Sequence, residues 1–142
     1  MNRIILSISF FTLSMLAFSQ DEITGFWLAG EGKTIVEIYE SDPKVYMGKI
    51  VWMEQPTDKK GRPHLDKMNQ DKSLRDREMM GIHILENLVY TGESWDGTLY
   101  VAKRGRKVNA SLSLASQEEL TIEISMMGRT FTRSWIRTEA PQ

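Results

Sequence analysis

The sequence predicts an all-β protein, a single antiparallel up-and-down β-barrel of about eight strands. Two observations lead to this fold class. Apolar and polar residues alternate over most of the chain, which is the pattern of half-buried strands and not of helices. The alternating segments are short and closely spaced, with turn residues between them. Because a sheet of this size has two free edges unless it closes, a barrel is favoured over an open β-sandwich, which stays the alternative.

Residues 1–19 have the composition of a secretory signal peptide. Arg3 is followed by an uncharged apolar run, and Ala17 and Ser19 form an A-x-S cleavage site. The run is too short for a transmembrane helix, which needs roughly 20 apolar residues. We therefore expect cleavage near Ser19 and export of one β-barrel domain, residues 20–142, to the periplasm or the extracellular space, with no stable membrane insertion.

The composition narrows the range of functions. The chain has 18 Lys and Arg residues against 19 Asp and Glu, a formal net charge of −1, so nothing draws it to nucleic acid. The sequence contains no cysteine, which excludes disulfides, thiol catalysis and cysteine-ligated metals. An apolar core must therefore stabilise the domain by itself.

Eight segments are predicted as strands in this order: residues 25–29, 33–40, 45–53, 82–90, 97–104, 106–114, 119–126 and 129–137. The clearest is 106–114, where Val108, Ala110, Leu112 and Leu114 share one face. Residues 41–43 and 115–119 read as turns. The basic stretch 103–107 is interpreted as a hairpin turn around Gly105, with an anion-binding patch as the alternative.

The first strand begins with a G-x-W sequence, Gly25 to Trp27, and the last strand carries two arginines. This arrangement resembles the lipocalin-like (calycin) barrels, in which such a tryptophan lies across one end and an arginine of the last strand packs over it. The resemblance implies a cation stacked on the indole where first and last strands meet. Arg133 and Arg137 are the candidates, and Arg133 is favoured because aromatic residues flank it.

One long segment, residues 54–81, interrupts the strands and is too long for an ordinary connection in a compact domain. Residues 71–80 are predicted to form a short helix, capped by Asp71 or Ser73 and ended by Gly81. We expect this segment to lie as a lid against the barrel.

The same region resembles the uncharacterised bacterial family catalogued as domain of unknown function 2147. The resemblance rests on "GKIVW" at 48–52, Asp66 and Asn69 followed by "LRDR" at 74–77, Gly81, and "GRT" at 128–130, and extends from Gly25 to about Arg137. The chain departs from the family at two positions. The family tends to have a proline after the residues that match Asn69 and Arg77, and this chain has Gln70 and Glu78 there. The resemblance implies a small exported β-barrel and no known activity.

No residue pattern supports catalysis or a bound metal. Two histidines, His64 and His83, make a weak zinc site without cysteine. The oxygen ligands of the long segment do not have the spacing of a calcium loop; they are Asp58, Asp66, Asn69 and Asp71. We therefore expect no cofactor and no metal, and do not favour an enzyme.

Three classes of function remain. The first and favoured one is binding of a small apolar or amphipathic ligand at the barrel mouth. The second is an envelope interaction or maintenance module without such a ligand, and the third is a hydrolase or isomerase. For the first, the apolar contacts are predicted to be Trp52, Tyr100 and Phe131, with Arg75 or Arg77 as a polar gate. Alternatively, both arginines pair with Asp76 and Glu78 on a solvated surface.

Overall fold

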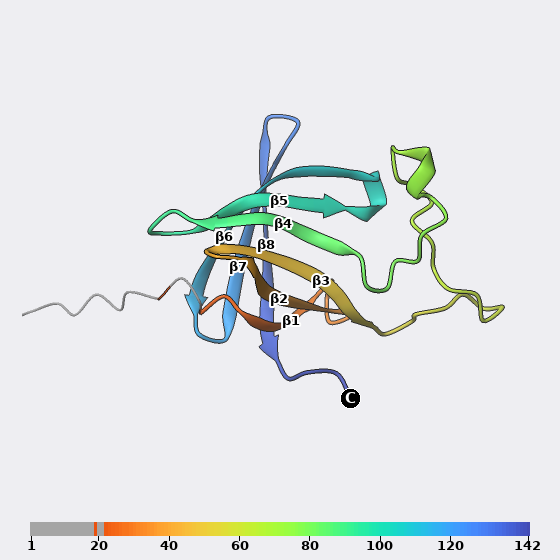
Figure 1. Cartoon of the computed structure of the whole chain (residues 1–142), viewed down its shortest axis with the longest axis horizontal. Coiled ribbons are helices and arrows are strands. Elements are labelled where there is room, and N and C mark those ends of the chain that lie inside the picture. The colour runs from red at the N-terminus through yellow and green to blue at the C-terminus, as the bar shows by residue number, and fades with distance from the viewer. Residues whose placement is uncertain (1–18, 20–21) are drawn as a thin grey trace, which may run out of the picture.

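The computed structural model describes residue 19 and residues 22–142 and shows a closed barrel of eight antiparallel strands. Each strand pairs with the next along the chain, and β8 returns to pair with β1 (Figure 1). The predicted fold class is therefore confirmed, whereas the predicted signal peptide lies, except for Ser19, outside the described residues. The strands are β1 (Gly25–Ala29), β2 (Thr34–Asp42), β3 (Val45–Met53), β4 (His83–Tyr90), β5 (Trp95–Val101), β6 (Arg106–Ser116), β7 (Glu119–Met126) and β8 (Arg129–Thr138).

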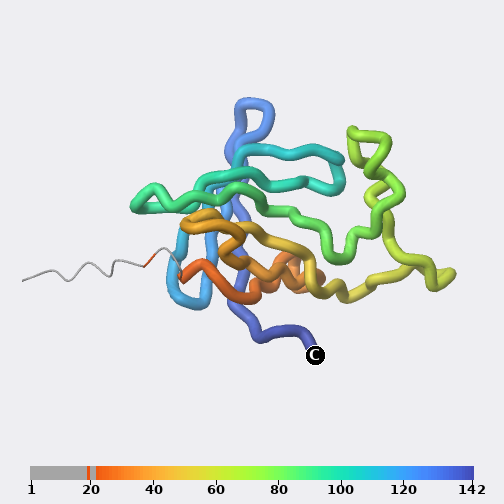
Figure 2. The backbone as a smooth tube through the Cα atoms, in the orientation of Figure 1, coloured from red at the N-terminus to blue at the C-terminus, as the bar shows by residue number. Residues whose placement is uncertain are grey.

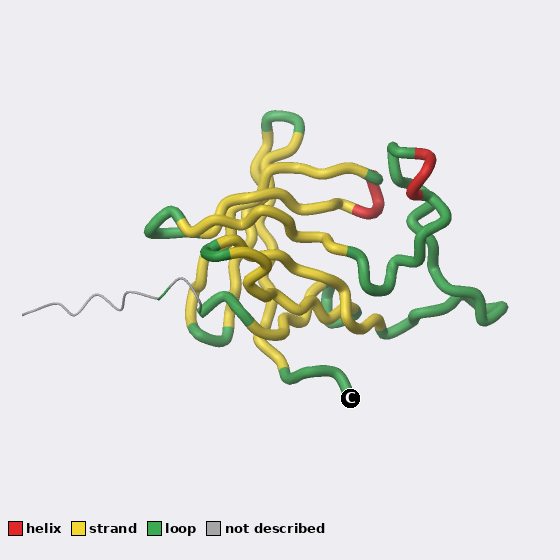
Figure 3. Tube along the Cα trace, in the orientation of Figure 1, coloured by secondary structure: helices red, strands yellow, loops and turns green. Residues whose placement is uncertain are grey.

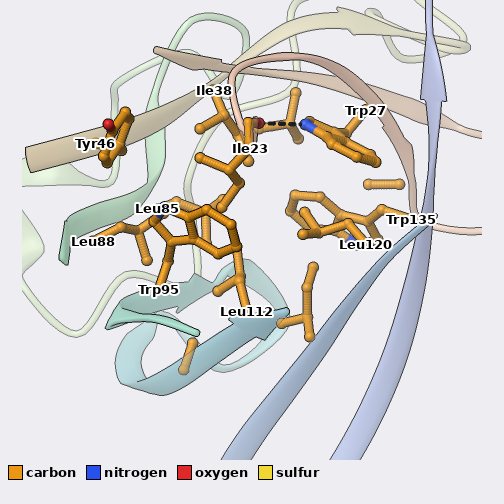
Figure 4. Close-up of a cluster of buried hydrophobic side chains, with 14 of the residues drawn as sticks. Ile23, Trp27, Ile38, Tyr46, Leu85, Leu88, Trp95, Leu112, Leu120 and Trp135 are labelled. Carbon is orange, nitrogen blue, oxygen red and sulfur yellow. Dashed lines mark hydrogen bonds between the residues drawn. The ribbon is translucent and has the colours of Figure 1, made fainter. Parts of the chain in front are cut away.

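The apolar core fills the barrel, as the alternation of the strands predicts. Leu112 of β6 lies opposite Ile122 of β7, and both side chains are buried. Each large side chain of this kind stabilises the fold by about 1.5–3 kcal/mol, so no covalent crosslink is required. Figure 4 shows the inward side chains gathered from several strands. The fully buried ones include Ile23, Trp27, Ile38, Tyr46, Leu85, Leu88, Trp95, Leu112 and Leu120.

Trp27 closes one end of the barrel. Its indole is 0% exposed, and its Nε1 donates a hydrogen bond to the carbonyl of Ile23 at 2.9 Å (Figure 4). The guanidinium of Arg137 stacks over the ring, with Cζ 4.2 Å from the ring centroid. Arg137 lies opposite Trp27 in the pairing of β8 with β1, which brings the cation to the indole. The preference for Arg133 as this partner is therefore wrong.

Arg137 also closes this end through hydrogen bonds to the backbone. Its guanidinium donates to the carbonyls of Thr24, Glu22 and Gln117 at 2.8, 2.6 and 2.6 Å. Gly25 has a φ of +123°, and a Cβ at this position would lie 2.9 Å from Nη1 of Arg137. The glycine two residues before Trp27 is thus needed both for its backbone conformation and for the space that the arginine occupies.

The long connection between β3 and β4 lies beyond the other end of the barrel and is almost entirely loop (Figures 2 and 3). In place of the predicted helix over 71–80, it contains one 3-10 turn, η1 (Lys72–Leu74). Asp71 does cap this turn, since its carboxylate accepts from the backbone N–H of Ser73.

Long-range pairing explains why the helix does not continue. The N–H of Met79 donates to the carbonyl of His64, and the N–H of Asp66 donates to the carbonyl of Arg77. Residues 77–79 therefore pair with residues 64–66, and the Met79 N–H is used by His64 and not by a helical hydrogen bond. Local sequence favours a helix here, but the tertiary structure overrides it. Within the described residues, the structure has no helix long and apolar enough to span a membrane.

Candidate functional site

An apolar cavity of about 550 Å³ occupies the end of the barrel opposite Trp27. Its walls come from the ends of the strands that meet there and from the short turns between them. Trp135, which also belongs to the core, contributes to the lining. Other apolar lining residues are Ala29, Ile50, Met53, Met79, Ile84, Leu99, Val101, Ala102, Ile124, Met126 and Phe131.

Two of the three apolar residues predicted at the ligand site line this cavity, namely Tyr100 and Phe131. Trp52 does not, because the pairing of β2 with β3 shifts by one residue: Ile35 pairs with Trp52, whereas the next residue of β2 pairs with Ile50. The extra residue of β3 is a β-bulge, and it inverts the alternation beyond it. Met53 therefore reaches the cavity in place of Trp52.

The two arginines predicted as a gate do not line the cavity and are used elsewhere. Arg77 donates from Nε to the Asp66 carboxylate at 2.9 Å, and its Nη2 forms an ion pair with the same oxygen. Arg75 donates from Nε to the backbone carbonyl of Asn69 at 2.8 Å. These contacts differ from both predictions, a polar gate at the cavity and ion pairs with Asp76 and Glu78.

Asp66 is the buried centre of a polar cluster, which we call the Asp66 network: Asp66, Asn69, Tyr100 and the half-buried Arg77. Asp66 is 1% exposed, and its carboxylate accepts from Asn69 Nδ2 at 2.8 Å and from the Tyr100 hydroxyl at 2.5 Å. The Arg77 guanidinium lies over the Tyr100 ring, with Cζ 5.5 Å from its centroid. Because Tyr100 belongs to β5, the network fastens the long connection to the barrel wall.

The network changes the acidity of its members. Burial disfavours the Asp66 carboxylate, but hydrogen bonds from Asn69, Tyr100 and Arg77 outweigh burial and lower the pKa of Asp66 below its usual 3.8. Burial, together with the hydrogen bond to Asp66, raises the pKa of Tyr100 to about 12. The network is therefore a fixed arrangement of an ionised carboxylate and a neutral phenol at neutral pH.

The connection also covers the turn between β5 and β6. This turn consists of η2 (Ala102–Arg104) and Gly105, whose φ is +64°, so the prediction of a hairpin turn around Gly105 is confirmed. Gln70 donates its backbone N–H to the Gly105 carbonyl at 2.9 Å. A Cβ on residue 105 would lie 1.6 Å from the carbonyl oxygen of Met68, so only glycine fits beneath the connection.

Three basic residues line the cavity as well: Lys103 and Arg104 from η2, and Arg133 from β8. No acidic side chain is among the described residues that line it. From the sequence, Lys103 and Arg104 belong to the alternative anion-binding patch at 103–107 and Arg133 is a candidate partner of Trp27, so none of the three was predicted at the ligand site. A signal was available for Arg133, since it lies between Phe131 and Trp135 on one face of an alternating strand.

Outside the Asp66 network, the side chains considered as metal ligands have partners of their own. Asp58 holds Arg62, and Asp71 holds Ser73. His83 Nε2 lies 2.6 Å from the Tyr39 hydroxyl, a hydrogen bond on the barrel wall. Across residue 19 and residues 22–142, no group of three or more His, Asp or Glu side chains is placed to hold a metal ion.

The fold is similar to that of a solved lipocalin. Protein HP1028 from the human pathogen Helicobacter pylori, described as belonging to the lipocalin family, matches with a TM-score of 0.67 and 20% sequence identity. The match covers 82% of this chain and 83% of HP1028, and at this identity it shows the fold alone. A comparison with curated proteins finds no match.

The sequence also matches a family of bacterial proteins over most of its length. The match spans residues 25–137, from the first strand to the arginine that stacks on Trp27. It includes the long connection with the Asp66 network. The protein therefore belongs to the family described as "Uncharacterized protein conserved in bacteria (DUF2147)", and it has the fold of a lipocalin-like barrel.

Proposed function

We propose that the protein binds a small apolar or amphipathic molecule in the open end of its barrel. The observation that carries the proposal is the apolar cavity of about 550 Å³ opposite the closed end. Its volume lies within the range of about 300–1,000 Å³ that is usual for small-molecule sites. The signal-like residues 1–19 support the further proposal that binding takes place after export.

The lining is suited to ligands of variable shape. Three methionines, Met53, Met79 and Met126, contribute unbranched and polarizable side chains that adapt to irregular surfaces. Phe131 and Trp135 add rigid aromatic surface on β8. Adaptable and rigid surfaces together favour a flexible hydrocarbon chain over a flat polar molecule.

A second candidate, an envelope interaction module, is favoured by exposed apolar side chains outside the cavity. Met68 on the long connection is 61% exposed, and Met127 in the β7–β8 turn is 79% exposed. Both belong to segments at the open end of the barrel. A protein partner that covers them would bind without any small molecule.

Ligand binding can be tested with N-phenyl-1-naphthylamine, an uncharged probe that fluoresces in apolar surroundings. We expect saturable binding at one site per chain, and a loss of about tenfold or more in affinity for Val101→Trp, which fills part of the cavity. Val89→Trp is the matched control, since Val89 lies on β4 outside the cavity and is 47% exposed.

Unfolding midpoints of both variants show whether the barrel remains folded. If the wild type does not bind the probe, or if folded Val101→Trp binds as tightly as Val89→Trp, the cavity is not the site. The interaction module then becomes the leading candidate.

A further inference from the structure

We infer that the ligand is an anionic amphiphile whose head group is bound by Arg133, Arg104 and Lys103 and whose chain enters the apolar cavity. This inference rests on the proposed function and specifies the chemical class of its ligand. The recognised chemistry is a small anionic head, a carboxylate or a phosphate monoester, on a single hydrocarbon chain.

Arg133 projects from the inner face of the barrel. It lies directly opposite Ile122 of β7, which is 1% exposed, and residues opposite each other in an antiparallel pair share a face. Its neighbours on that face, Phe131 and Trp135, also line the cavity. An arginine among apolar inward residues of a strand is unusual unless its charge is used.

Solvent reaches Arg133 because β8 extends past β1 at this end. Only Ile136, Arg137 and Thr138 of β8 pair with β1. The side chain is exposed although its strand position faces inward. Among the described residues, the guanidinium donates one hydrogen bond, from Nη1 to the adjacent Thr132 carbonyl at 2.9 Å, which leaves other N–H donors for a ligand.

Lys103 and Arg104 approach the same cavity from the β5–β6 turn. Both side chains are exposed, and the turn is fixed by hydrogen bonds from the Gly105 N–H to the carbonyls of Val101 and Ala102 at 2.9 and 3.1 Å. The long connection packs on Gly105 and is itself held by the Asp66 network. The network is therefore a positioning device for these two cations.

No acidic side chain of the described residues forms an ion pair with the cations at the cavity. The ion pairs of the described residues use Lys49, Arg62, Arg77 and Lys107, and none involves a cation of the cavity lining. A cluster of one sign beside a low-dielectric cavity attracts counter-charged ligands. Guanidinium groups match carboxylate and phosphate oxygens in geometry as well as in charge.

The test compares four ligands of equal chain length with the full chain, each below its critical micelle concentration: dodecanoate, dodecyl phosphate, dodecanol and dodecylamine. Binding is measured by displacement of N-phenyl-1-naphthylamine. We expect dodecanoate or dodecyl phosphate to bind about tenfold or more tightly than dodecanol, and dodecylamine to bind most weakly. The two anions show whether carboxylate or phosphate is preferred.

Arg104→Gln combined with Arg133→Gln should remove the preference for anions and leave the affinity for dodecanol unchanged. Lys59→Gln combined with Lys60→Gln changes the net charge equally at exposed residues of the long connection and should keep the preference. The inference is overturned if wild type binds dodecanol as tightly as the anions, or if the arginine variant keeps the preference. In both cases ligand binding stands, whereas failure of all four ligands to bind overturns the proposed function as well.

Discussion

Two arginines on one face of β8 have different roles because their donors have different partners. Arg137 stacks on Trp27 and directs its guanidinium at three backbone carbonyls. The guanidinium of Arg133, four residues earlier, has one partner among the described residues, the backbone carbonyl of Thr132. Spacing alone places both on the inner face, so the sequence could not tell the residue that closes the barrel from the one that lines the cavity.

Removal of the indole tests the closed end at the level of one residue. Trp27→Ala should lower the free energy of unfolding by about 3–5 kcal/mol, because the buried ring leaves a cavity and the guanidinium of Arg137 loses its stacking surface. Urea denaturation followed by circular dichroism measures the change. Trp52→Ala, at a half-buried tryptophan, is the control and should cost less. Equal midpoints for wild type and Trp27→Ala would contradict this account.

At the scale of elements, the strands and the position of the long connection were predictable, whereas the internal structure of the connection was not. Alternation along each strand is local, so sequence shows it directly. The failed helix over 71–80 and the misplaced Trp52 have a common reason: pairing with residues far along the chain decided both. Leu65 bridges to Glu78 and prevents the helix, and an extra residue in β3 turns Trp52 away from the cavity.

The Asp66 network should hold the connection as one element. Asp66→Asn removes the charge that Arg77 faces and weakens the hydrogen bond from Tyr100, so we expect faster hydrogen exchange and proteolysis within residues 54–82. The barrel should keep its secondary structure. Asp58→Asn, at a surface ion pair with Arg62, is the matched control and should change little. If residues 54–82 of Asp66→Asn are protected from exchange and proteolysis as well as in wild type, the network is not needed to hold the connection.

In the whole molecule, the two ends of the barrel have different roles: the closed end stabilises the fold, and the open end holds the proposed binding site. The end with Trp27 is filled, and the other end keeps an apolar cavity beneath a connection fixed by polar contacts. The sequence predicts a site at the barrel mouth, because the connection must return over it. The sequence offers the basic stretch 103–107 as an alternative anion-binding patch but does not place Lys103 and Arg104 at the cavity, since contacts made after folding position their turn.

The Asp66 network at the open end makes the stability of the protein depend on pH. The lowered pKa of Asp66 means that its contribution is present above the usual value of 3.8 and is lost as the pH falls through the folded-state pKa. The raised pKa of Tyr100 acts in the opposite direction. Its contribution is present below pH 10.0 and is lost as the pH rises to about 12, because the unfolded chain loses the proton first.

Tyr100→Phe isolates the alkaline part of this dependence. At pH 7 the variant should be less stable than wild type by about 1–3 kcal/mol, because a buried carboxylate of Asp66 loses a donor. Between pH 10 and about 12 the two proteins should converge, since only wild type loses the phenolic contribution. Urea titrations at several pH values measure the difference. Tyr90→Phe, whose hydroxyl donates to the exposed Gly92 carbonyl, corrects for alkaline effects elsewhere in the chain. A difference between wild type and Tyr100→Phe that stays constant from pH 8 to pH 12 would show that Tyr100 and Asp66 do not act together in the folded protein.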